Sequence, residues 1–116
     1  MPAQTFNLRG TYRIEQGADY RLEVSVNDVD TGLPYSLVGA SAAAQIREAV
    51  AGEVSYEFTC TIDEETSVIT VAMLAEDTAS IDIATGYWDL ELTEADGTVT
   101  RLLQGNVVIN PEVTRG

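Results

Sequence analysis

The chain has 116 residues, 45% of them hydrophobic and 22% charged, which is the balance of an ordinary globular domain with a single core. Nineteen acidic residues against six arginines give a formal net charge of −13. Such a surface repels phosphate backbones and anionic lipid, so neither nucleic acid nor a membrane is expected as a partner. The lack of histidine and the single cysteine argue against serine–histidine catalysis, histidine metal sites and an intrachain disulfide.

The first residues, Met1–Phe6, contain neither a basic region nor an apolar stretch, and nowhere do about eighteen apolar residues follow one another. We therefore expect no signal peptide and no membrane span, with synthesis in the cytoplasm.

The clearest strand is Tyr20–Asn27, where apolar and polar residues alternate without a break. One face of this strand carries its apolar side chains, Tyr20, Leu22, Val24 and Val26. The next residues, Asp28–Pro34, contain the glycine, proline and aspartates typical of a tight reversal. We expect a half-buried strand followed by a turn.

The segment Ser41–Glu48 is ambiguous, because alanine, glutamine, arginine and glutamate also favour a helix. Its small and apolar residues alternate, it lies between predicted strands, and the turn-forming pair Ala51-Gly52 follows it. We therefore predict a strand.

Two further strands are predicted at Tyr56–Ile62 and Ser67–Met73. In the first, Cys60 falls on the apolar side and is interpreted as a small buried residue rather than a reactive thiol. The second is apolar on both faces, which indicates a central or covered strand. The helix-favouring stretch Leu74–Ile81 then predicts one short helix.

The last two strands are predicted at Tyr87–Thr93 and Thr98–Ile109, joined by a hairpin at the pair Asp96-Gly97. In the first of them Trp88 shares the apolar face, so a core position is favoured over a binding platform. In the second, Gly105 indicates a bulge or a close approach by another backbone.

These elements predict an all-β domain, an antiparallel immunoglobulin-like β-sandwich of about seven strands with one short helix. Residues 1–11 are expected to form an extended N-terminal arm, residues 12–110 the sandwich, and residues 111–116 a C-terminal tail.

Acidic turns are the remaining candidates for chemistry. The run Asn27–Gly32 begins like a calcium loop, but its glycine comes one position early and Gly39 stands where the final acid is needed. Turn-capping aspartates explain it better. The clusters Asp63-Glu64-Glu65 and Glu76-Asp77 match no catalytic motif. We expect no enzyme activity, no cofactor and no metal.

Candidate interface residues are the exposed aromatics and the apolar residues of the two terminal segments. They are Phe6, Leu8, Tyr12, Tyr87 and Pro111.

Four segments of the chain resemble a family of small tailed-bacteriophage proteins. They are Ile14–Tyr20, Ala44–Arg47, Gly86–Leu92 and the closing run Asp96–Thr114, the most specific of the four. The chain is also similar to the immunoglobulin-like N-terminal domain of phage baseplate upper proteins, although it ends after one domain.

The resemblance implies a non-enzymatic structural protein of the virion, made in the host cytoplasm and present in symmetric copies. Its partners would be other virion proteins, either the major capsid protein or tail and baseplate proteins. A head cement or decoration protein and a tail, neck or baseplate adaptor both remain open. The alternative is a host-surface or carbohydrate-binding immunoglobulin-like module.

Overall fold

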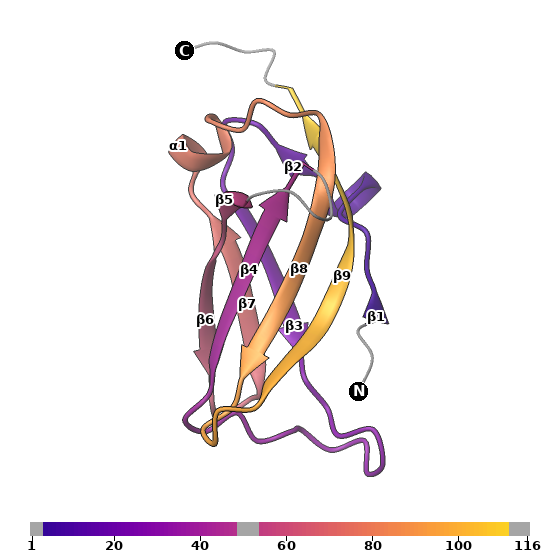
Figure 1. The fold of residues 1–116 in the computed structure, drawn as a ribbon, viewed down its shortest axis with the longest axis vertical. Coiled ribbons are helices and arrows are strands. Elements are labelled where there is room, and N and C mark those ends of the chain that lie inside the picture. The colour runs from indigo at the N-terminus through magenta and orange to yellow at the C-terminus, as the bar shows by residue number, and fades with distance from the viewer. Residues whose placement is uncertain (1–3, 49–53, 112–116) are drawn as a thin grey trace.

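The structure is a computed structural model that describes residues 4–48 and 54–111, and it consists of two β-sheets packed face to face (Figure 1). The larger sheet has the order β1-β9-β8-β4-β5, with β2 also paired to β9, and the smaller has the order β3-β7-β6. The strands are β1 (Gln4–Thr5), β2 (Ile14–Glu15), β3 (Tyr20–Ser25), β4 (Ser41–Arg47), β5 (Val54–Glu57), β6 (Thr59–Asp63), β7 (Val68–Met73), β8 (Thr85–Thr93) and β9 (Val99–Asn110). The predicted immunoglobulin-like β-sandwich is confirmed.

The smaller sheet follows the sequence pattern closely. β7 is its central strand and pairs antiparallel with both β3 and β6. Ile69, Val71 and Met73 of β7 are buried against the larger sheet, and the alternate side chains are half-buried. This explains why the β7 segment is apolar on both faces.

The alanine-rich segment forms β4, as predicted, and not a helix. β4 lies between β5 and β8, so each of its edges has a strand to pair with. Ala44 and Ile46 are buried in the core. Pairing on both edges therefore outweighs the helix propensity of the segment.

The predicted strand at Tyr56–Ile62 is wrong as a single element. Its first part, β5, belongs to the larger sheet and its second part, β6, to the smaller one. The chain crosses between the sheets at Phe58, whose amide donates to the carbonyl oxygen of Ala44 at 3.0 Å and whose side chain is buried. This crossover closes one side of the sandwich.

The predicted short helix is α1 (Ala75–Thr78), which lies at one end of the sandwich (Figure 1). The hydroxyl of Thr78 is buried and bonds the loop before β3. It donates to the carbonyl oxygen of Ala18 at 2.8 Å and accepts from the amide of Gly17 at 3.0 Å. A second, 3-10 helix, η1 (Gly10–Tyr12), lies between β1 and β2.

β8 and β9 form the predicted hairpin, and Gly97 in its turn has a φ of 91°, a conformation that favours glycine. The register shifts between two pairs, Leu90 with Leu103 and Glu91 with Arg101. Leu102 is therefore the extra residue of a β-bulge, a position that the sequence did not reveal.

The predicted arm is wrong for residues 4–8, because this segment pairs with β9 and belongs to the sandwich, whereas residues 1–3 of the arm and 112–116 of the predicted tail lie outside the described residues. β1 pairs in parallel with β9, and Leu8 forms an isolated parallel bridge with Val107. Leu8 is fully buried in the core. Burying the apolar side chain of Leu8 lowers the free energy of the folded state, and pairing with β9 satisfies the backbone groups of an otherwise open strand edge.

Gly105 gives the N-terminal segment room to approach β9. A Cβ at Gly105 would lie 2.5 Å from the carbonyl oxygen of Phe6 and 2.7 Å from Oδ1 of Asn7. The expected close approach of another backbone is confirmed.

The carbonyl of Phe6 is turned away from the β-ladder and accepts from Nε1 of Trp88 at 2.7 Å. In a regular parallel ladder the amide of Asn106 would donate to this carbonyl. It donates instead to the side-chain Oδ1 of Asn7 at 3.0 Å. A buried indole N–H and a strand amide are thus both satisfied by neighbouring residues of one segment.

Trp88 joins a chain of aromatic rings that runs through the core from one sheet to the other. Its ring centroid lies 6.5 Å from that of Phe6 and 6.4 Å from that of Phe58. Phe6 contacts Tyr12 at 4.9 Å, and Phe58 contacts Tyr20 at 6.0 Å. The predicted core position of Trp88 is confirmed, since only 3% of the residue is exposed.

Replacing Trp88 with alanine should cost about 3–5 kcal/mol of unfolding free energy, because it leaves a cavity and removes the partner of the Phe6 carbonyl. Urea denaturation measures this loss. Trp88→Phe keeps most of the ring volume but not the hydrogen bond, and should lose less. Equal stability of Trp88→Ala and the parent chain would contradict the core position.

Replacing Gly105 with alanine should cost about 1–3 kcal/mol, although alanine is otherwise the better strand residue, because the new methyl displaces Phe6 and Asn7. The displacement should also shift Trp88 fluorescence to longer wavelength. Thr100→Ala, on the same strand, adds no atom and is the control. Unchanged stability and emission of Gly105→Ala would show that the segment is not held there.

Candidate functional site

The outer face of the larger sheet, on the side away from the core, carries a cross-strand array of polar side chains. The register places Tyr87 of β8 between Arg47 of β4 and Asn106 of β9. Two residues further along β8, on the same face, Asp89 lies between Gln45 of β4 and Gln104 of β9. Alternation along each strand explains the arrangement, because the residues between these, such as Trp88 and Leu90, point into the core.

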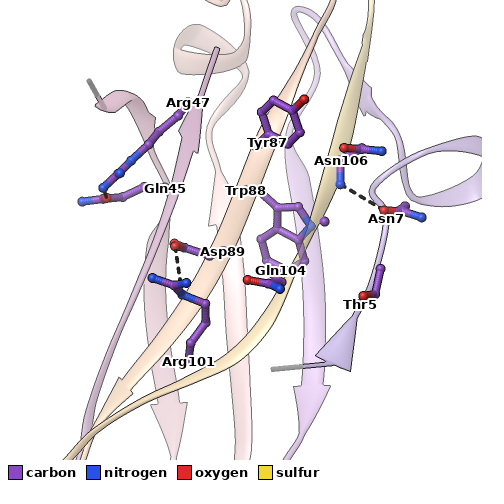
Figure 2. Close-up of a pocket in the computed structure, with 11 residues that line it drawn as sticks. Thr5, Asn7, Gln45, Arg47, Tyr87, Trp88, Asp89, Arg101, Gln104 and Asn106 are labelled. Carbon is purple, nitrogen blue, oxygen red and sulfur yellow. Dashed lines mark hydrogen bonds and ion pairs between the residues drawn. The ribbon is translucent and has the colours of Figure 1, made fainter. Parts of the chain in front are cut away.

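A groove with a volume of about 330 Å³ lies on this outer face (Figure 2). Its lining residues are Thr5, Asn7, Gln45, Arg47, Tyr87, Trp88, Asp89, Arg101, Gln104, Gly105 and Asn106. All of them except Trp88 and Gly105 have polar side chains. We call it the outer-face groove.

Of the two arginines that line the groove, Arg47 donates to Oε1 of Gln45 at 3.3 Å, and Arg101 is paired with carboxylates. Arg101 lies between two carboxylates, with Nε 3.4 Å from Oδ2 of Asp89 and a terminal nitrogen 3.5 Å from Oε2 of Glu91. The Asp89 side chain is 26% exposed. Partial burial raises the pKa of Asp89 above its ordinary value of 3.8, and the opposing effect of Arg101 on this pKa is smaller.

A second surface feature is the edge formed by η1 and the residues beside it. Tyr12 is 47% exposed, its ring packs on Phe6, and its carbonyl oxygen accepts from the hydroxyl of Tyr20 at 2.7 Å. Arg9 and Arg13 flank it and are exposed. We call Arg9, Tyr12 and Arg13 the edge patch.

The five predicted interface residues have different environments. Tyr12 and Tyr87 are exposed, at 47% and 42%, and Pro111 is exposed at the end of β9. Phe6 is partly buried against the core. Leu8 is fully buried, so its prediction as an interface residue is wrong for this fold.

The sequence did not single out Arg47, Asp89 and Arg101. Each occupies an outward position in an alternating strand, which from sequence alone has the pattern of an ordinary solvated face. Only the strand order shows that they meet. Arg101 in particular reaches Asp89 because the β-bulge at Leu102 shifts the register of β9.

The turn at Asn27–Gly32 is capped by an aspartate side chain, as predicted, and so is the turn that begins at Asp63. Oδ1 of Asp28 accepts from the amides of Asp30 and Thr31 at 2.8 and 3.1 Å. Oδ1 of Asp63 does the same for Glu65 and Thr66. Within residues 4–48 and 54–111, no three Asp, Glu or Cys side chains are grouped so as to hold a metal ion.

Cys60 is partly buried on the core side of β6. Burial raises the pKa of its thiol, which lowers the fraction of reactive thiolate near neutral pH. In the described part of the chain, no helix is long and apolar enough to cross a membrane.

Comparison with known proteins gives a fold likeness only. No model of a known protein family matches the chain, and no curated protein is similar to it. Among solved structures it is similar to CopC from Methylosinus trichosporium OB3b, with a TM-score of 0.47 and 9% sequence identity over 90% of this chain and 89% of that one. A likeness of this degree carries no information on function.

Replacing Asp89 with asparagine should raise the melting temperature at pH 7. The pKa of Asp89 is raised on folding, so the folded protein holds this proton more tightly than the unfolded chain does. The charged carboxylate therefore lowers stability above that pKa, and the cost disappears as the pH falls below the ordinary value of 3.8.

Thermal melts from pH 7 down to about pH 3, where a carboxyl group is largely protonated, measure this effect. Asp30→Asn removes the same charge at an exposed turn and measures the gain that comes from net charge alone. A gain for Asp89→Asn that does not shrink on acidification would show that the raised pKa of Asp89 is not its cause.

Proposed function

We propose that this protein is a non-enzymatic structural subunit of a tailed-bacteriophage virion that docks onto other virion proteins. The support is the resemblance of four segments to a family of small phage proteins. Two of them, Gly86–Leu92 and Asp96–Thr114, include most of β8 and β9, the hairpin on which the larger sheet is built. The similarity therefore lies in the part that organises the fold.

The surface for docking is the edge patch, and the exposure of Tyr12 is the observation that carries this choice. Tyrosine and arginine are among the residues enriched in protein interfaces. Two of the six arginines of an acidic chain flank this tyrosine. The ring is already held by Phe6 and its backbone by Tyr20, so docking costs little side-chain entropy.

Outside the edge patch, the acidic surface of the chain indicates that the partner is basic. A formal net charge of −13 attracts a basic acceptor and speeds its encounter with the chain. Added salt screens this attraction, whereas the contact of Tyr12 is insensitive to salt. Association should accordingly weaken with salt without being abolished.

In this proposal the protein is made in the host cytoplasm and acts in the virion. Its place there is either the head, as a cement or decoration protein, or the tail, neck or baseplate, as an adaptor. Mass spectrometry of purified virions tests the assignment, because a structural subunit must be found there in many copies. Its absence from the particle would overturn the proposal. A cryo-EM map would then distinguish head from tail and give the symmetry.

A host-surface or carbohydrate-binding module is the second candidate function. Its specific support is the outer-face groove with the exposed Tyr87, since exposed aromatic rings beside polar side chains are a common arrangement in small-ligand sites.

Replacing Tyr12 with serine should weaken binding to particles assembled without the protein by at least about tenfold, because a central aromatic anchor contributes about 2 kcal/mol or more. Co-sedimentation measures the binding. Tyr87→Ser, which removes a ring of similar exposure from the outer face, is the matched control and should bind as the parent chain does. Equal binding by Tyr12→Ser would show that the edge patch is not the docking surface.

A further inference from the structure

The outer-face groove has polar groups with no partner among the residues that the structure describes. They are the hydroxyl of Tyr87 and the side-chain amides of Gln104 and Asn106, all of which line the groove (Figure 2). An amide offers two donors and an acceptor, and a hydroxyl offers one donor and accepts as well. A ligand that both donates and accepts along its length matches this set.

The mixture of both signs of charge in and beside the groove disfavours strongly charged ligands. Arg101 is already paired with Asp89 and with Glu91, which lies beside the groove, and Arg47 donates to Oε1 of Gln45 at 3.3 Å. An anion would meet Asp89 and Glu91, and a cation would meet the two guanidinium groups. A neutral ligand is repelled by neither.

Tyr87 adds an apolar surface at the rim. It is 42% exposed, and its neighbours across the sheet, Arg47 and Asn106, do not cover it. A flat ring of this kind packs against the C–H face of another ring while leaving that ring's polar edges free. The volume of about 330 Å³ is near the lower end of the usual range for small-ligand pockets.

We infer that the outer-face groove is a binding site for a neutral saccharide of one or two rings. A pyranose has apolar C–H faces and a rim of hydroxyls, each of which donates and accepts. One face stacks on Tyr87, and the rim hydrogen-bonds to Gln104, Asn106 and the carboxylate of Asp89. The inference rests on the second candidate function, the carbohydrate-binding module, and names its ligand class; it is independent of the proposed virion role.

The test is an NMR titration of the ¹⁵N-labelled full chain with maltose, cellobiose, lactose and N,N′-diacetylchitobiose. Each is added to at least about 10 mM, since millimolar dissociation constants correspond to only about 4 kcal/mol. At least one disaccharide should saturably shift the side-chain amide signals of Gln104 and Asn106. No saturable shift with any of the four would overturn the inference.

Two variants locate the site. Tyr87→Ala and Asp89→Ala should each weaken the binding at least about tenfold, because each removes a direct contact. Tyr12→Ser, at the edge patch, should leave it unchanged. Their well-dispersed spectra confirm folding. Binding that survives in Tyr87→Ala would place the ligand elsewhere and overturn the inference.

Sialyllactose tests the charge argument, because it adds a carboxylate to lactose. The neutral sugars should bind more tightly than this anion, and the reverse order would overturn the assignment of a neutral ligand. The outcome is separate from docking: Tyr12→Ser tests virion binding alone and Tyr87→Ala saccharide binding alone, so either function can fail without the other.

Discussion

The sandwich depends on the hydrogen bond between the indole of Trp88 and the carbonyl of Phe6, and on the missing side chain at Gly105 that allows it. A buried indole N–H needs an acceptor, and here that acceptor is the carbonyl oxygen of Phe6. The N-terminal segment supplies its backbone. The same segment places Leu8 in the core and pairs with the edge of β9. The hydrogen bond of the Trp88 indole is therefore coupled both to core packing and to the protection of a strand edge.

Strand alternation gives β8 two separate tasks. Its inward residues, Trp88 and Leu90, hold the core, and its outward residues, Tyr87 and Asp89, line the outer-face groove. Because the inward side chains are fixed by packing, the backbone of β8 holds the outward side chains at defined positions along the sheet. A rigid sheet is therefore a suitable base for a site whose polar groups must remain free for a ligand.

Alternation and turn chemistry make most strands predictable from the sequence. The hairpin at Asp96-Gly97, the short helix and the core position of Trp88 are local consequences of residue type and spacing. The crossover at Phe58 is not predictable, because an alternating pattern continues through it while the chain changes sheets. Leu8 has the pattern of an arm residue for a similar reason, since its partner Val107 lies at the other end of the chain. The groove is hidden from sequence because its residues come from strands distant along the chain.

The parallel pairing of β1 and β2 with β9 has a consequence for how the protein is made. Segments 4–5 and 14–15 leave the ribosome long before β9 exists, and Leu8 bridges to Val107 only when synthesis of that strand is complete. Contacts between residues so far apart in sequence slow folding, because the chain loses loop-closure entropy before the contact stabilises it. During that interval Trp88 has no Phe6 carbonyl in place and the edge of β9 is open. The chain is therefore most prone to aggregation just before the segment 4–8 pairs with β9. Its high net negative charge makes incompletely folded copies repel one another during this step.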